Sequence, residues 1–175
     1  GEIVDRSGNT ILIGSSTGTA VKGTTTNDNA AAGYVGEYFE NIRSSATPNM
    51  TTTVVCSIDS GNVTLNDGNE TGIALTAGDW DIQGTASFTG AAGTTGSAIW
   101  VWIGTAKGTA TTGRNAATNS QRLTTAFSAD LRYTVSTPRY RVSIGSTTTY
   151  YLKCQPDFAV STLSATGIIC ARRVR

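Results

Sequence analysis

The stretch RYTVSTPRYRVSIGSTTTYYLKCQPDFAVSTLSATGIICARRVR, residues 132–175, decides the fold class of this chain. In residues 140–144, tyrosine, valine and isoleucine alternate with arginine and serine, and residues 150–155 repeat the alternation. Successive side chains of a β-strand point to opposite faces, so one set is buried and the other meets solvent or a partner. The stretch therefore predicts consecutive strands that run to the last residue.

The composition of the 175 residues favours the same class. Only 14% of the residues are charged and 38% are hydrophobic, so the polar surface comes from threonine, serine, asparagine and glycine. Threonine, the commonest residue, is β-branched and suits pleated strands. The 20 glycines against 3 prolines are typical of many tight turns. We therefore expect one all-β domain with its own core.

Further strands are predicted upstream. Residues 79–89 alternate between large apolar side chains and polar ones. Residues 97–104 are apolar on both faces, which indicates a central strand covered on both sides or a strand at a subunit contact. Residues 105–122 are polar without periodicity and predict a surface excursion. Roughly eight to ten short strands at this spacing indicate an antiparallel β-sandwich of the jelly-roll kind.

The N-terminal part differs from the rest. Residues 1–29 contain two short apolar bursts, at 3–4 and 11–13, separated by a Ser-Gly-Asn turn signal. We expect a shaft-like β stalk segment or a flexible linker here, followed by a β-sandwich domain over residues 30–175. Residues 30–45 have helical spacing, but their glycines and aromatics favour a strand over a short helix.

The sequence offers little for catalysis. It has no histidine, which excludes Ser-His-Asp and Cys-His catalysis and most zinc sites. Asp79 and Asp81 lie on one strand face at about the separation of a glycosidase pair, although a solvated strand face has the same pattern. Residues 59–70 lack calcium-loop spacing, and the glycine-rich residues 90–96 lack the P-loop lysine. We expect no enzyme, cofactor or metal site, and three free cysteines.

Charge is distributed unevenly along the chain. Residues 1–87 hold 3 Lys/Arg against 10 Asp/Glu, a net −7, whereas residues 88–175 hold 10 against 2, a net +8. Such a split steers assembly between copies or makes one end basic, unless the two halves interleave and cancel. The net charge of +1 and the lack of a known module argue against nucleic-acid binding. No apolar run is long enough for membrane insertion.

Five short motifs follow one another along residues 27–175. They are G-Y-V-G-E-Y at 33–38, L-T-A-G-D-W-D at 75–81, R-Y-x-V-S at 132–136, Y-Y-L-x-x-Q at 150–155 and A-R-R-V-R at 171–175. Their order resembles the C-terminal head (tip) domain of tail-fibre or tail proteins of tailed phages and prophages. The resemblance implies a trimeric, jelly-roll-like head without catalytic residues.

The same resemblance implies a function. The head would bind a bacterial surface polysaccharide or outer-membrane protein as a homotrimer, at the tail-fibre tip of a virion, after synthesis in the host bacterial cytoplasm. One alternative is a structural trimerisation cap or decoration module that binds no receptor. A more remote alternative is a polysaccharide depolymerase that uses Asp79 and Asp81.

Two sets of residues are predicted to carry contacts. Loops at the distal end would bind the receptor, and the polar excursion supplies Arg114, Asn115, Asn119, Gln121 and Arg122. Strands over residues 97–104 and 166–174 would line the axis of a trimer. The predicted subunit-interface residues are Ile99, Trp100, Val101, Trp102, Ile168, Ile169 and Arg172.

Overall fold

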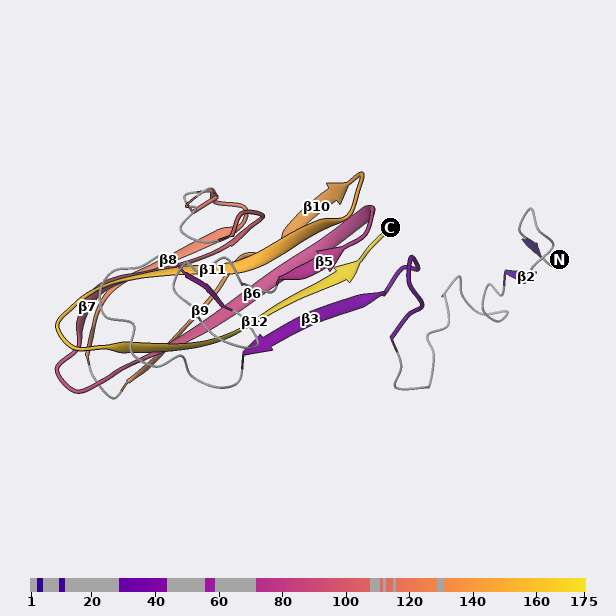
Figure 1. Ribbon diagram of the computed structural model, residues 1–175. Coiled ribbons are helices and arrows are strands. Elements are labelled where there is room, and N and C mark those ends of the chain that lie inside the picture. The colour runs from indigo at the N-terminus through magenta and orange to yellow at the C-terminus, as the bar shows by residue number, and fades with distance from the viewer. Residues whose placement is uncertain are drawn as a thin grey trace, which may run out of the picture.

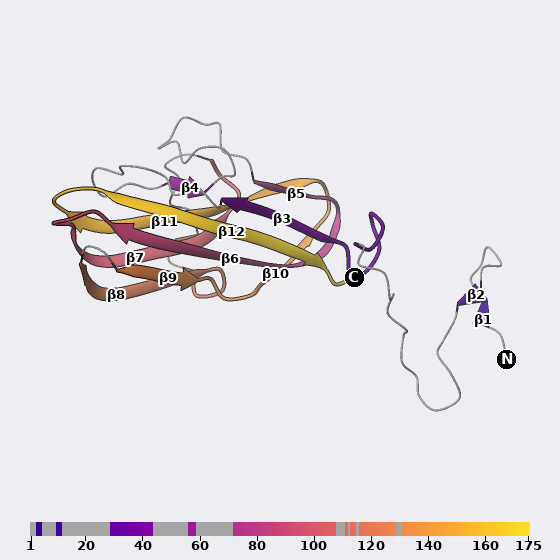
Figure 2. The same cartoon turned by 90° about the horizontal axis from the view of Figure 1, so that it is seen from below.

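The computed structural model describes residues 3–4, 10–11, 29–43, 56–58, 72–107, 111, 113–114, 116–128 and 131–175. These residues form strands and turns and no helix, which confirms the predicted all-β class (Figure 1). None of them belongs to a helix that could cross a membrane. A two-stranded antiparallel pair, β1 (Ile3–Val4) and β2 (Thr10–Ile11), lies apart from the remaining strands (Figures 1 and 2).

The remaining strands form two antiparallel sheets of five strands each. Sheet 1 contains β3 (Tyr38–Arg43), β6 (Gly78–Gly90), β9 (Arg132–Ser136), β10 (Tyr140–Ile144) and β12 (Leu163–Arg173). Sheet 2 contains β4 (Cys56–Ile58), β5 (Ile73–Leu75), β7 (Thr95–Gly104), β8 (Ser120–Ser128) and β11 (Thr148–Ala159). Figure 2 shows β3, β12 and β6 side by side in one layer.

The strand order is that of a jelly roll. Sheet 1 runs β3-β12-β6, with β9 and β10 both beside β6, and sheet 2 runs β4-β11-β7-β8, with β5 also beside β11. Chain-consecutive strands such as β6 and β7, or β11 and β12, belong to opposite sheets. This alternation between two packed sheets confirms the predicted sandwich.

The core lies between the inner faces of the two sheets. On β6, Trp80, Ile82, Ala86 and Phe88 are fully buried, whereas the residues at alternate positions, such as Asp81 and Gln83, reach the outer face. The buried residues pack with Val101 of β7 and Leu152 of β11 in one apolar cluster. The period-two pattern of residues 79–89 therefore predicted the buried face correctly.

The sandwich has two distinct ends. At one end, here called the entry end, residues 29–37 lead into β3, and β12 ends at the C-terminus (Figures 1 and 2). At the opposite end, here called the tip, the β6–β7 turn lies beside the β11–β12 turn, because Ala91 N donates to Thr162 O at 2.9 Å. The long axis of the domain therefore separates the chain entry from these two turns.

Several local expectations can be compared with the strands. The ambiguous residues 30–45 contain turns and then β3, so the strand was the correct choice. Residues 56–58 form β4, and the residues on either side of it, 44–55 and 59–71, lie outside the described residues. Cys170 is a free thiol, as predicted, and Cys154 is buried in the core, as its position in the alternating pattern of β11 indicates.

Candidate functional site

The strongest candidate site lies on the outer face of sheet 2, around Trp100. Cross-strand register places Trp100 of β7 opposite Gln155 of β11 on one side and Arg122 of β8 on the other. Arg114 reaches the same place from the excursion between β7 and β8, and its guanidinium donates to Gln155 Oε1. These four residues, Trp100, Arg114, Arg122 and Gln155, are called the Trp100 site below.

Two guanidinium groups contact the indole ring. The guanidinium carbon of Arg122 lies 4.5 Å from the Trp100 ring centroid, and that of Arg114 lies 5.2 Å from it. Such cation–π contacts hold the planar guanidinium groups in place against the ring. The ring therefore serves as a platform that orients two arginines.

The charge of this site is not neutralised within the described part of the chain. The four ion pairs found there involve Arg139, Arg141, Arg173 and Arg175 and leave out Arg114 and Arg122. In addition, Nε of Arg114 is buried without a hydrogen-bond partner among the protein atoms. Arginine N–H groups in this arrangement suit a carboxylate or phosphate, which accepts several charge-assisted hydrogen bonds.

The other predicted receptor residues fare differently. Gln121 is exposed on β8, and its amide donates to Arg122 O at 3.2 Å. It lies opposite the core residue Val101, so its side chain leaves the strand on the face opposite to Arg122 and Trp100. Asn119 is only 7% exposed, and its amide donates to Ile103 O at 2.8 Å. Its assignment to receptor contact was wrong, because this side chain fastens the excursion to β7. Asn115 lies outside the described residues.

The position of the excursion also corrects an expectation. The excursion begins after Gly104 and returns at Ser120, and Gly104 lies opposite Tyr151, near the start of β11. The tip holds the other ends of these strands, where Thr95 lies opposite Ala159. The excursion therefore leaves sheet 2 on the entry side instead of forming the distal loops that the sequence suggested.

The predicted subunit-interface residues divide into two groups. Ile99, Val101 and Ile169 belong to the core, and Trp102 on the outer face of sheet 2 is also fully covered. These four assignments were wrong, because the single chain already buries the side chains. The doubly apolar pattern of residues 97–104 marks a central strand covered on both sides.

The remaining interface candidates lie on outer faces. Trp100 and Ile168 are half-buried, and Arg172 is exposed. On sheet 1, Ile168 lies opposite Ile42 of β3, which is 46% exposed, and Arg172 lies opposite Tyr38, with its guanidinium 5.6 Å from that ring. The outer face of sheet 1 therefore carries a small apolar patch next to an arginine.

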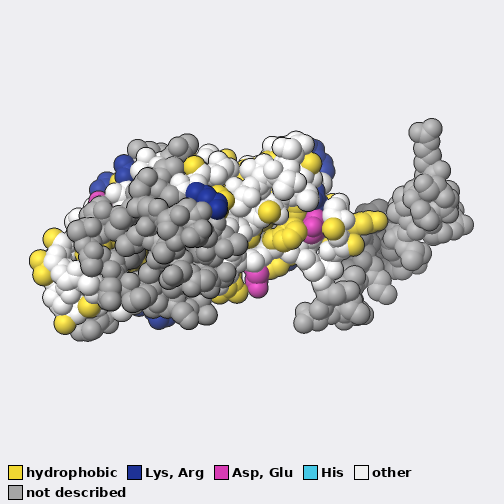
Figure 3. Space-filling view, in the orientation of Figure 1, with side chains coloured by type: hydrophobic (Ala, Val, Ile, Leu, Met, Phe, Trp, Pro, Cys, Tyr) yellow, Lys and Arg dark blue, Asp and Glu magenta, His cyan; other side chains and the backbone are white. Residues whose placement is uncertain are grey.

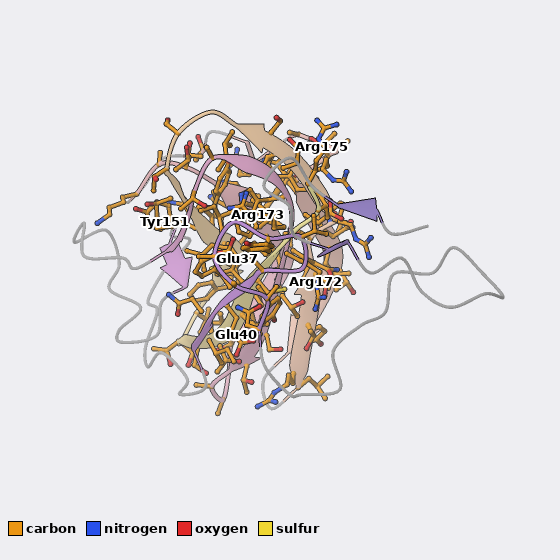
Figure 4. All side chains as sticks on the ribbon, turned by 90° about the vertical axis from the view of Figure 1, so that its right-hand side faces the viewer. Glu37, Glu40, Tyr151, Arg172, Arg173 and Arg175 are labelled. Carbon is orange, nitrogen blue, oxygen red and sulfur yellow. The ribbon has the colours of Figure 1, made fainter. Side chains whose placement is uncertain are left out.

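A buried ion pair joins three of the sequence motifs at the entry end. Arg173 Nε lies 2.8 Å from Glu37 Oε2, and both side chains are only 4% exposed (Figure 4). The same guanidinium donates to Ala77 O at 2.8 Å and to Thr76 Oγ1 at 2.5 Å, and it lies 4.3 Å from the ring of Trp80. The motifs at 33–38, 75–81 and 171–175 thus meet in one cluster.

Backbone hydrogen bonds extend this cluster. Gly36 N donates to Arg173 O at 2.9 Å, and Arg173 N donates to Glu37 O at 2.8 Å. Glu37 also accepts from Gly33 N at 2.8 Å, which closes the turn that precedes β3. The segment leading into the sandwich is therefore fastened to its last strand, and the chemistry of the cluster is structural.

The two aspartates considered for glycosidase chemistry are both paired with arginines. A hydrogen bond from Ser143 and then the charge and hydrogen bond of Arg175 lower the pKa of Asp79. The Arg141 hydrogen bond, with the Arg141 and Arg139 charges, lowers the pKa of Asp81. A glycosidase general acid needs a raised pKa, so the environment of this pair does not suit that role.

Comparisons with known proteins give a fold-level likeness. No protein-family model matches the sequence, and no curated protein matches it either. Among solved structures, the chain is similar to the VP2 subviral particle of infectious bursal disease virus, with 10% sequence identity and a TM-score of 0.42. The similarity covers 79% of this chain and 33% of that one, so the chain spans about a third of the length of that neighbour.

Proposed function

We propose that this chain is the head domain of a tail-fibre or tail protein of a tailed phage or prophage. In this role it attaches the virion to the bacterial surface by binding an anionic surface polysaccharide. The observation that carries the proposal is the pairing of Arg114 and Arg122 on Trp100, on an outer sheet face, without an acidic partner among the described residues.

The chemistry of the Trp100 site favours an acidic glycan over an outer-membrane protein as the receptor. The two guanidinium groups would bind the carboxylate of a uronic acid or a phosphate substituent. The amide of Gln155 lies beside them and would bind a sugar hydroxyl. Shallow sites of this kind on a rigid sheet need little rearrangement when an extended polymer binds.

The resemblance supplies the biological setting. Three of its five motifs meet in the buried Glu37–Arg173 cluster, so they are tied to one structural feature of the entry end. A fibre shaft that precedes residue 29 would join the head there. The opposite tip and the outer face of sheet 2 would then be accessible to the host surface.

The site is tested by binding the protein to an array of bacterial surface polysaccharides with known repeating units. Replacing both Arg114 and Arg122 by glutamine should weaken binding to acidic polymers about tenfold or more, because each charge-assisted hydrogen bond contributes about 1.5–3 kcal/mol. The matched control, Arg132→Gln with Arg139→Gln, makes the same charge change on sheet 1 and should bind like the unmodified protein. Equal losses in both variants would point to non-specific attraction.

The proposed trimer has a separate test. Ile42 and Ile168 form an apolar patch on the outer face of sheet 1, next to Arg172, and a neighbouring chain would cover it. Light scattering of the purified protein should give a mass near three times the 18.1 kDa of one chain. A mass near 18.1 kDa would contradict the trimer. A trimer that binds no polysaccharide and no cells would fit a structural cap or decoration module instead.

A further inference from the structure

The tip carries a backbone conformation that costs free energy. The connection between β11 and β12, residues 160–162, places Val160 at φ 64° and Ser161 at φ 61°. Glycine adopts positive φ readily and asparagine tolerates it, whereas most other residues do not. Valine is β-branched and rarely adopts this region, so its presence here is an outlier. Its side chain is 70% exposed, so packing against the described residues does not explain it.

A groove lies next to this turn. It has a volume of about 370 Å³ and is lined by Thr95, Gly96, Ser97, Asp157, Phe158 and Ala159. This volume lies within the range of small-molecule sites. Figure 3 shows hydrophobic side chains in yellow at this left-hand end of the molecule, among the backbone and other side chains in white. The groove and the exposed Val160 therefore form one surface feature of the tip.

A β-bulge shapes the groove. On β7, Gly96 pairs with Phe158 and Ala98 pairs with Asp157, so Ser97 has no counterpart on β11. The pairing of β7 with β8 is irregular at the same residue. Bulges leave the extra residue outside the ladder and re-aim its side chain, and they occur frequently next to binding sites. Ser97 is exposed and thus offers its hydroxyl, and the backbone around it, to a ligand.

The groove continues the face that carries the Trp100 site. Gln155 and Asp157 are two residues apart on β11, so both point to the outer face of sheet 2, about 7 Å apart along the strand. Trp100 lies opposite Gln155, and Ala98 lies opposite Asp157. An extended ligand bound at Trp100 would therefore reach the groove within about one or two sugar units.

The Trp100 site and the tip groove differ in charge. The Trp100 site contributes two arginines, whereas Asp157 is the one charged residue among those lining the groove. A carboxylate here accepts hydrogen bonds from hydroxyl groups and repels an anionic ligand. Ser97 adds a hydroxyl that both donates and accepts. This chemistry fits a neutral sugar ring.

We infer that the tip groove is a second subsite, which binds a neutral sugar next to the acidic one held at Trp100. The receptor would then be a polysaccharide whose repeating unit alternates acidic and neutral residues. In this arrangement, Asp157 and Ser97 bind the hydroxyls, and Val160 contacts the C–H face of the ring. The inference rests on the proposed function. It adds the class of polysaccharide that the outer face of sheet 2 would select.

The test uses the complete chain and the same polysaccharide array. The unmodified protein should bind polymers that alternate acidic and neutral residues at least about fivefold more tightly than polymers acidic at every residue. Asp157→Asn removes the repulsion at nearly constant shape and should abolish most of this preference. The double change Val160→Asn with Ser161→Gly should weaken binding to alternating polymers about fivefold, while its thermal midpoint rises because the turn is relieved of strain.

The outcomes separate the two proposals. Equal binding of both polymer classes, unchanged by Asp157→Asn, would overturn the second subsite and leave the anionic site intact. The second subsite is likewise overturned if Val160→Asn with Ser161→Gly binds every polymer as the unmodified protein does, because this variant should fold at least as well. Binding to no polymer of either class would overturn both proposals together.

Discussion

Replacing Arg173 by methionine should lower the free energy of unfolding by about 3–5 kcal/mol, the usual cost of breaking a buried ion pair on one side. The Glu37 carboxylate would then be buried without its partner 2.8 Å away. The change also removes the hydrogen bonds to Ala77 O and Thr76 Oγ1 and the contact with Trp80. Urea denaturation of both proteins measures the loss.

A second arginine at the same end provides the control. Arg175 lies 2.7 Å from Asp79, but its side chain is 86% exposed and lies further from the middle of this end than Arg173 does (Figure 4). Because exposed ion pairs are screened by water, Arg175→Met should change stability far less than Arg173→Met. Similar losses of stability in the two variants would show that burial of the Glu37–Arg173 pair does not determine how much the entry end contributes to the free energy of unfolding.

The change Gly78→Ala should cost about 1–3 kcal/mol for its backbone alone and more through Arg173. Gly78 has φ +142°, and a Cβ built on it would overlap Nη1 of Arg173 and lie 3.3 Å from Arg175 O. The guanidinium cannot move aside freely, because it is held by Glu37 and Ala77. The residue before Asp79 is therefore glycine for a steric reason as well as a conformational one.

Two comparisons isolate the steric part of this effect. Gly93 also has a positive φ, +83°, but nothing lies within 4 Å of its added Cβ, so Gly93→Ala reports backbone strain alone. In a chain that already carries Arg173→Met, the cost of Gly78→Ala should fall, because the obstructing guanidinium is gone. Strictly additive losses in this double-mutant cycle would refute the proposed clash.

The elements that the sequence predicted best are those whose pattern is local. Residues 79–89 and 140–144 alternate with period two, and β6 and β10 bury the faces that this alternation indicates. Residues 97–104 were expected to be a central strand covered on both sides or a strand at a subunit contact, and β7 lies between β11 and β8 in sheet 2. The period-two alternation of a strand depends only on the residues of that strand, so it can be detected in a single sequence.

The site depended on information that the sequence does not carry locally. Arg114 and Arg122 were predicted to bind the receptor, but their meeting at Trp100 follows from the β7–β8 and β7–β11 register. In the sequence, nothing distinguishes Asn119 from its polar neighbours. In the structure, its side-chain amide donates to Ile103 O and fastens the excursion to β7. Single-sequence patterns give the type of an element and leave open which residues lie opposite one another.

The uneven charge along the chain has a simple structural cause. Each of the four ion pairs in the described part of the chain joins an acidic residue between positions 37 and 81 to an arginine between positions 139 and 175. The acidic first half and the basic second half thus interleave on one sandwich. Glu37 and Arg173 are 136 residues apart, so only the topology could reveal their pairing.

The central claim, attachment to a bacterial surface glycan, is tested most directly on whole cells. Fluorescently labelled protein is added to a panel of bacterial strains, with and without periodate oxidation of their surface sugars. The account predicts adsorption to strains whose surface polysaccharides contain acidic units, and loss of adsorption after periodate treatment or after replacement of Arg114 and Arg122. Adsorption to no strain, or adsorption that periodate leaves unchanged, would contradict it.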